Sequence, residues 1–347
     1  MKKSAIVNNI LFAIGILAVG VMVANIGWQS ILKNIEDTGW WFLAVLAVWL
    51  VVYVLNAMSW RLIIRNNCEE AKRIPFLYIL KLTITGYAIN CSTPVGLMGG
   101  EPYRILELKK YVGTTKATSS VILYSMMHVV SHFLLWMISA LLIAVTIPMD
   151  EGLIGTLVGV FVVCFALLIL FFKGYKKGMV VKVFTLLRKL PYVKKWALKF
   201  YQNNEEKLQI IDEQIAHLHG NQKRRFYSSL GLELLARVVG CLEIYFIVQA
   251  MGFDITFIDS VIVVAFSSLF ANILFFSPMQ LGTREGGYIL ALKLLALPAN
   301  LGFSVSIITR IRELFWIALG MMIMKLQPDA SSLPTLEETP LNVEENV

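Results

Sequence analysis

The chain has 347 residues, of which 57% are hydrophobic and only 16% are charged. A typical soluble domain has roughly 25% charged residues, so the composition excludes an ordinary soluble protein and indicates an integral membrane protein. The net charge of +8 would suit a nucleic-acid partner, but the charge is unevenly distributed. Residues 173–199 hold nine Lys or Arg and no acidic residue. The positive-inside rule predicts this pattern for a cytoplasmic loop, so we expect no nucleic acid.

The beginning of the chain predicts a retained membrane helix. Met1-Lys2-Lys3 and the apolar run after them resemble a signal peptide, but residues 22–30 offer no small-residue cleavage site. Three apolar runs without any charge then predict transmembrane helices, because each has close to the ~20 residues that cross a bilayer. They are residues 10–26, 40–58 and 152–172. A longer run, 117–149, contains two histidines but no Asp, Glu, Lys or Arg.

The charges of the connecting segments predict the topology. Acidic segments with few basic residues should be external, and segments rich in Lys and Arg should be cytoplasmic. The external segments are 28–39, 148–152 and 251–259, and the cytoplasmic ones are 61–73, 109–116 and 173–226. Membrane helices are then expected at about 8–27, 40–60, 117–147, 152–172, 227–250 and 301–324, with both termini in the cytoplasm.

Three parts of different character follow from this topology. Residues 1–325 form the membrane domain, and residues 173–226 are a cytoplasmic insertion with an amphipathic helix near 204–219. The tail, 326–347, has five acidic residues, three prolines and no Lys or Arg, so we expect it to be disordered and cytoplasmic.

Residues 74–108 cannot be one ordinary membrane span. The run 74–92 enters from the cytoplasm, and the chain must be back there by Lys109. The stretch TPVGLMGGEPYR, residues 93–104, places Pro94 and three glycines between two apolar runs. The pattern predicts a re-entrant pair of short helices broken at Pro94, since proline lacks a backbone donor and crowds the preceding turn.

The same arrangement recurs later in the chain at an offset of 184 residues. Without gaps, the offset aligns Thr93-Pro94 with Ser277-Pro278, Glu101 with Glu285, Ser120-Val121 with Ser304-Val305, and His128 with Arg312. The second broken segment, about 258–298, follows an external loop and so enters from outside. The fold class predicted is an all-α polytopic membrane bundle of two inverted repeats, each with a broken re-entrant helix pair, as in many transporters.

The two breaks are candidate ligand sites. Non-helical backbone within a bilayer is tolerated only where protein or a water-filled cavity satisfies its polar groups. Glycines at the breaks permit close approach of a ligand, and the half-helix that follows presents free N–H groups suited to a phosphate or carboxylate. Glu101 and Glu285 lie near those helix starts, where each could cap the backbone or bind a cationic group or a proton.

Other ionisable residues inside predicted spans are candidates too, because such residues usually face a partner or a cavity. Glu233 and Arg237 are four residues apart and could simply pair along their own helix. Arg310 and Arg312 could pair with Glu285 or Glu101, or bind an anion. Glu243 and Glu313 are also ionisable residues inside these predicted spans.

Metal binding and nucleotide chemistry find little support in the sequence. His128 and His132 share a helix face, but without an HExxH pattern we expect polar contacts within the bundle. The cysteines are isolated, with no CxxC pair that would favour a disulfide framework or a zinc site: Cys68, Cys91, Cys164 and Cys241. GxGxxG, P-loop and GxSxG motifs are absent. We expect no metal, no cofactor and no catalytic residue.

The stretch Pro94-Val-Gly-Leu-Met-Gly-Gly-Glu101-Pro-Tyr-Arg104 resembles the P-x-G-x-x-G-G-E-x-x-R signature of the lysylphosphatidylglycerol synthase transmembrane region, a flippase-like family. Pro278-x3-Gly282-x2-Glu285 resembles its second element. The resemblance covers about residues 8–325. It carries over to Pro94, Gly99, Gly100, Glu101, Arg104, Pro278, Gly282, Glu285 and Arg310 or Arg312. Relatives often have an arginine on the helix after the first motif, where this chain has Met126-Met127-His128.

The resemblance implies an inner-membrane protein whose best-known relatives attach lysine to phosphatidylglycerol and flip the product. In those relatives a separate soluble domain is the catalyst, and we expect it to be missing here. The leading hypothesis is a lipid translocase or lipid-binding transporter for a phospholipid, aminoacyl-lipid or lipid-linked glycan. Glu101 and Glu285 would be polar anchors, and Arg104, Arg310 and Arg312 phosphate contacts.

Secondary candidates for ligand contact are Glu233, Arg237 and His128. The alternatives are a membrane enzyme or enzyme subunit acting on a lipid-linked substrate, and a structural scaffold. Expected partners are membrane lipids, with a homo-oligomer or a separate synthase or glycosyltransferase as further partners.

Overall fold

The computed structural model describes residues 26–65, 69–92, 99–148, 150–175, 222–273 and 282–325, with scattered helical residues in 12–24 and 205–216. Within these ranges there is no strand, which confirms the all-α prediction. The first predicted helix and the cytoplasmic insertion lie largely outside the described residues, and the tail 326–347 lies wholly outside them.

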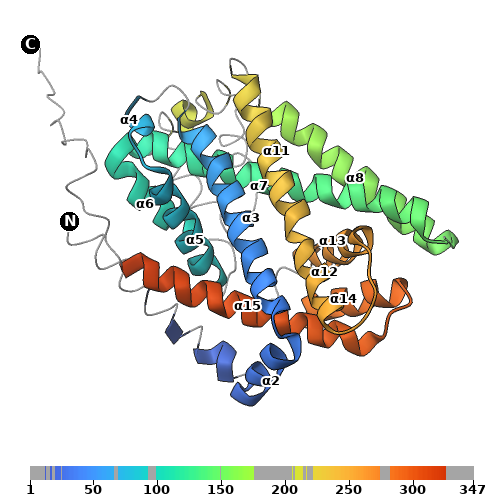
Figure 1. Cartoon of the computed structure of the whole chain (residues 1–347). Helices are drawn as coiled ribbons and strands as arrows, with labels where there is room; N and C mark the ends of the chain where they lie inside the picture. Colours follow the sequence, from blue (N-terminus) through green and yellow to red (C-terminus); the bar gives the residue numbers. More distant parts are fainter. Residues whose placement is uncertain are drawn as a thin grey trace, which may run out of the picture.

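Figure 1 shows the described helices, coloured in chain order. Their bounds are α2 (Trp28–Thr38), α3 (Trp41–Ile64), α4 (Glu69–Lys72), α5 (Phe76–Ser92), α6 (Gly100–Val112), α7 (Thr114–Thr146), α8 (Glu151–Tyr175), α11 (Lys223–Gly240), α12 (Leu242–Ala250), α13 (Phe257–Ile273), α14 (Thr283–Leu294) and α15 (Ala299–Lys325).

Among the described residues, three helices are long and apolar enough to cross a membrane. They are α3, α7 and residues 151–173 of α8. They confirm the spans predicted near 40–60, 117–147 and 152–172. The outer face of α8 exposes large apolar side chains, with Val162, Phe165 and Leu170 each more than half exposed. Such surface is stable against lipid tails, which are as apolar as the side chains themselves.

The structure corrects the single span predicted at 227–250. The chain forms two helices there, α11 and α12, with a turn at Cys241 between them. Because α12 is as apolar as a membrane span, hydropathy alone does not reveal the interruption. The predicted span at 301–324 is part of one long helix, α15, which carries Arg310, Arg312 and Glu313.

The region predicted to be re-entrant forms two separate short helices, α5 and α6, on either side of residues 93–98. With 17 residues, α5 is about 26 Å long, somewhat less than the ~30 Å hydrocarbon core of a bilayer. The corresponding later region likewise forms α13 and α14, on either side of 274–281. The two helices of each pair pack against each other. In addition, α6 packs against the long helix α7, and α14 packs against the long helix α15.

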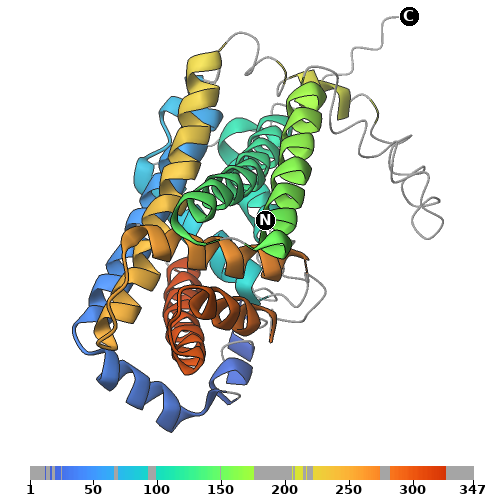
Figure 2. The ribbon, with the colours of Figure 1, turned by 90° about the vertical axis from the view of Figure 1, so that its right-hand side faces the viewer.

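The helices α3 and α11 lie side by side and run antiparallel (Figures 1 and 2). Ser59 Oγ lies 2.8 Å from Ser229 Oγ, whereas Trp49, earlier in α3, donates a 2.8 Å hydrogen bond to Glu243, later in the chain. The helix α15 crosses below α3 in the view of Figure 1 and packs along α5.

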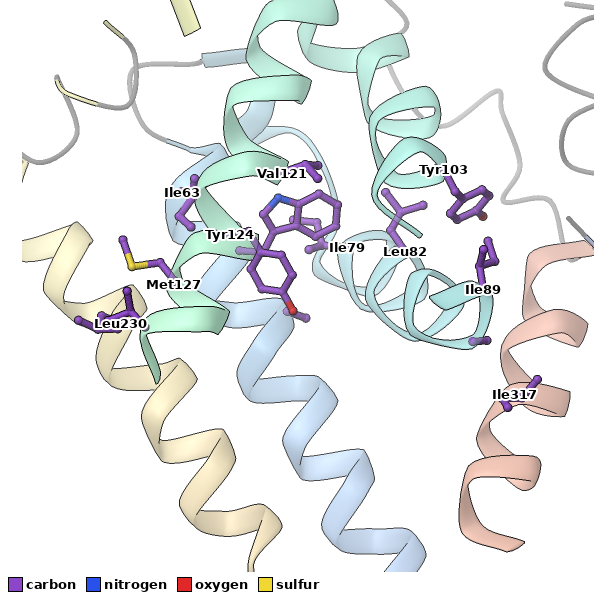
Figure 3. Close-up of a cluster of buried hydrophobic side chains, with 14 of the residues drawn as sticks. Ile63, Ile79, Leu82, Ile89, Tyr103, Val121, Tyr124, Met127, Leu230 and Ile317 are labelled. Carbon is purple, nitrogen blue, oxygen red and sulfur yellow. The ribbon is translucent and has the colours of Figure 1, made fainter. Parts of the chain in front are cut away.

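One apolar core includes residues of all the helices named above, and Figure 3 shows a part of it contributed by α3, α5, α6, α7, α11 and α15. Trp60 of α3 and Met127 of α7 are fully buried in it. The rings of Trp60 and Tyr124 pack together, with centroids 5.7 Å apart. This core holds α6 and α7 against α3, which positions the polar side chains that these helices carry.

The approach of α6 to α5 requires glycine. A Cβ atom on Gly100 would overlap the carbonyl oxygen of Gly86, and a Cβ atom on Gly86 would overlap the Arg104 side chain. The backbones therefore touch where α6 begins, and no side chain fits between them.

We predict that Gly100→Ala destabilises the protein by about 1–3 kcal/mol, because the added methyl group overpacks a backbone contact. Gly231→Ala on α11 is the matched control, since a Cβ atom there meets nothing within 4 Å. Alanine in that helix should be neutral or stabilising by up to about 1 kcal/mol. Denaturant titration of helicity in detergent micelles measures both, and equal destabilisation by the two variants would contradict the close contact.

Candidate functional site

The first site begins where α6 starts. Pro94 lies outside the described residues, Gly99 precedes α6, and Gly100 is its first residue. Asn90 of α5 joins the two helices, because its Oδ1 accepts the Gly100 N–H at 2.7 Å and its Nδ2 donates to Glu101 Oε1 at 3.1 Å. A side-chain amide thus satisfies one of the free N–H groups at the start of the half-helix.

Arg104, one turn after Glu101, is buried against aromatic rings. Its guanidinium lies 5.3 Å from the centre of the Tyr124 ring and 5.9 Å from that of Trp60, within cation–π range. It donates to the Thr83 carbonyl at 3.3 Å and lies 3.4 Å from Glu101 Oε1. Arg104 is therefore held in place with only a long contact to a carboxylate.

The secondary candidates lie between α7 and α11. His128 Nδ1 is 2.9 Å from Glu233 Oε2. Arg237 donates from Nε to Ser131 Oγ at 2.7 Å and from Nη2 to the His128 carbonyl at 3.1 Å. Glu233 and Arg237 thus bind α7 across the helix interface, and the pairing along their own helix that the sequence allowed is not the arrangement observed.

We call Glu101, Arg104, Tyr124, His128, Glu233 and Arg237 the first polar cluster. Tyr124 lies within electrostatic range of Glu101, Arg104, Glu233 and Arg237. Several buried atoms in or beside this cluster have no hydrogen-bond partner among the described residues: Glu101 Oε2, Arg104 Nε, Glu233 Oε1, Ser125 Oγ and His132 Nδ1. An unsatisfied buried polar group costs about 1–3 kcal/mol and more when charged, so the cluster offers both acceptors and a donor to a ligand.

The second predicted site begins where α14 starts. Pro278 lies outside the described residues, and Gly282 caps the helix with a positive φ of 80°. Glu285 Oε2 accepts the Gly282 N–H at 2.8 Å. Its Oε1 accepts from Ser306 at 3.0 Å and from Arg310 at 3.0 and 2.6 Å. Both oxygens of Glu285 are therefore satisfied, in contrast to Glu101.

Arg312 forms the most buried ion pair of the described chain, with side-chain exposures of 3% for Arg312 and 6% for Glu243. Its Nε and Nη2 donate to the two oxygens of Glu243 at 2.8 and 3.1 Å, a bidentate geometry that strengthens the pair. The guanidinium lies 3.7 Å from the centre of the Trp49 ring and donates to Tyr87 Oη at 3.2 Å. We call Glu243, Arg284, Glu285, Arg310, Arg312 and Glu313 the second polar cluster; Arg284 pairs there with Glu313.

Sequence reasoning foresaw the carboxylates and arginines but not all of their partners. The pairing of Arg310 with Glu285 was one expected alternative, whereas Glu243 as the partner of Arg312 was not. Asn90 and Trp49, which bond Glu101 and Glu243, stand in apolar runs and were missed. A polar amide within the run 74–92 was the one signal that could have pointed to Asn90.

We predict that Arg312→Met destabilises the protein by about 3–5 kcal/mol, because it leaves the buried Glu243 carboxylate without its cation. Lys110→Met is the matched control, since Lys110 pairs with Glu107 while 41% exposed. Loss of such a surface pair should cost less than about 1 kcal/mol. Denaturant titration in micelles measures both values, and a small effect of Arg312→Met would show that the pair contributes no stability.

The chain as a whole matches one protein family. No curated protein and no solved structure matches the chain significantly. The family model described as "Lysylphosphatidylglycerol synthase TM region" matches residues 8–320. The apolar helices and this match make the chain a multi-pass membrane protein related to lipid handling. The chain belongs to the lysylphosphatidylglycerol synthase transmembrane-region family.

Proposed function

We propose that the protein is a lipid translocase or lipid-binding transporter of the cell inner membrane, and that a lipid headgroup binds at the first polar cluster. The observation that carries the proposal is the set of buried, unpartnered polar atoms of Glu101, Arg104 and Glu233. Ionisable groups inside a membrane bundle are costly, and they usually mark the path of a substrate or ion.

The chemistry of these atoms fits a phospholipid or a lipid-linked glycan. Arg104 supplies a fixed cation whose buried Nε donor has no partner among the described residues, and a guanidinium suits a phosphate oxygen. Glu101 Oε2 and Glu233 Oε1 accept hydrogen bonds, which suits hydroxyl or ammonium groups of a headgroup. A headgroup that carries both kinds of group would satisfy all three side chains together.

The second polar cluster has a different part in this proposal. Arg310 and Arg312 already bond carboxylates at 3.1 Å or less, so a phosphate would have to displace Glu285 or Glu243. Arg104 is therefore the favoured phosphate contact. Arg310, Arg312 and Glu285 hold the second half of the bundle together.

Two features support an arrangement of inverted halves. The helices α3, α5, α6 and α7 begin at positions that correspond, within about three residues of the 184-residue offset, to the beginnings of α11, α13, α14 and α15. The first pair of counterparts, α3 and α11, packs antiparallel. Inverted halves around a central site permit alternating access. We propose that both termini of the chain lie in the cytoplasm.

We predict that Glu101→Gln lowers lipid exchange about tenfold or more, because hydrogen bonds to a charged group contribute about 1.5–3 kcal/mol. Purified protein is reconstituted into liposomes with fluorescent phospholipids, and the rate at which label from the inner leaflet becomes accessible to a membrane-impermeant quencher is measured. Glu107→Gln is the matched control, since Glu107 lies on the same helix and bonds Lys110 and Tyr78 outside the cluster.

The control should exchange lipid at the wild-type rate. Wild-type protein that exchanges lipid no faster than empty liposomes would contradict the proposal for the lipids tested. Equal rates for wild type, Glu101→Gln and Glu107→Gln would remove Glu101 from the site.

A further inference from the structure

The contact between His128 and Glu233 joins an accessible side chain to a fully buried one. The His128 side chain is 44% exposed and that of Glu233 is 0% exposed, although Nδ1 and Oε2 are 2.9 Å apart. The other carboxylate oxygen, Oε1, is buried and has no hydrogen-bond partner among the residues that the structure describes. Glu233 therefore reaches accessible surface through the imidazole of His128.

We propose that His128 relays protons to Glu233, and that this pair is a proton-binding site which regulates the lipid movement proposed above. The inference rests on that proposed function only for its effect on transport; proton binding itself stands on the His128–Glu233 geometry. Chains of His and carboxylate side chains carry protons through many membrane pumps and transporters. Histidine suits this task because it titrates between about pH 5 and 8.

The relay step balances without any co-reactant. In the resting state the imidazole is neutral, and its Nδ1–H donates a hydrogen bond to the Glu233 carboxylate. A proton from the accessible side binds Nε2, the Nδ1 proton passes to Oε2, and the imidazole is again neutral with its proton on Nε2. Glu233 becomes a neutral carboxylic acid, which removes a charge from a site where one oxygen has no partner.

The surrounding charges come from three helices. His132 and Tyr124 lie on α7, Arg237 lies on α11, and Arg104 and Glu101 lie on α6. The other helices that pack against α7, namely α3, α8 and α13, carry their charged residues near their ends: Arg61, Glu151, Lys173 and Asp259. Arg237 bonds the His128 carbonyl, so α7 stays attached to α11 in either protonation state.

The second half of the chain supplies a natural contrast. At the 184-residue offset, Arg312 takes the position of His128, and Trp49 takes that of Glu233. The Arg312 guanidinium lies 3.7 Å from the centre of the Trp49 ring and is paired with the buried Glu243. Arginine keeps its proton in proteins, and tryptophan has no carboxylate to protonate, so the corresponding contact of the second half offers no proton-binding pair and the proposal places proton control in the first polar cluster.

Infrared difference spectroscopy of the reconstituted protein tests proton binding directly. A pH jump from about 8 to about 5 spans the range in which histidine titrates. It should produce a protonated-carboxyl C=O band, of which Glu233→Gln loses one component. His128→Gln should slow the appearance of that component several-fold, and Glu107→Gln should leave the band and its time course unchanged. If Glu233→Gln does not fold, Glu233→Asp keeps a carboxyl group and should shift the component instead.

The same samples report on transport. Lipid exchange should change several-fold with pH in wild type and in Glu107→Gln, and should be independent of pH in Glu233→Gln, or altered in its pH profile in Glu233→Asp. An infrared band that is identical in wild type and the Glu233 variant, or an unchanged time course in His128→Gln, would overturn the relay. Expected infrared results without any lipid exchange would leave the relay standing and refute the proposed function, so the two failures are distinguishable.

Discussion

The buried ion pair between Arg312 and Glu243 joins four helices at one point. Arg312 belongs to α15 and Glu243 to α12, while Trp49 of α3 and Tyr87 of α5 bond or stack against the pair. Within an apolar bundle a lone arginine or glutamate would cost several kcal/mol, so each residue requires the others. This requirement constrains how α15 crosses α5 and how α12 meets α3, and the position of the second polar cluster follows from it.

The two halves of the chain have corresponding helices, but their glutamates differ in hydrogen bonding. In each half, a glutamate near the start of a half-helix faces a long helix with polar side chains. Glu285 has four hydrogen bonds to its two oxygens, from Gly282, Ser306 and Arg310, whereas Glu101 keeps Oε2 unpartnered. A satisfied cluster stabilises a bundle, and an unsatisfied one is retained where a ligand or a proton completes it. This asymmetry supports the proposal that the ligand binds in the first half, while the second half stabilises the bundle.

Features that depend on neighbouring residues along the chain could be predicted from the sequence. Some 20 apolar residues without a charge predict a membrane helix regardless of context, which is why α3, α7 and α8 were found. Pro94 and the glycines after it predicted separate helices on either side of the break, because proline interrupts a helix whatever its surroundings. The turn at Cys241 was missed because no proline marks it. The partners of Glu101 and Arg312 were missed because Asn90 and Trp49 come from other helices, and their contacts exist only once those helices pack.

The close contact of Gly86 with Gly100 explains why the first cluster lies where it does. Because no side chain fits between α5 and α6 there, Asn90 can reach the Gly100 N–H and hold Glu101. The Arg104 side chain then passes over Gly86 and meets Tyr124 and Trp60. Tyr124 lies one helical turn before His128, with ring centroids 6.3 Å apart, so the same tyrosine borders both Arg104 of α6 and the contact of His128 with Glu233. Tyr124 is within electrostatic range of both Arg104 and Glu233. The proposed change of charge at Glu233 would therefore alter the electrostatic potential around Arg104 in this low-dielectric interior.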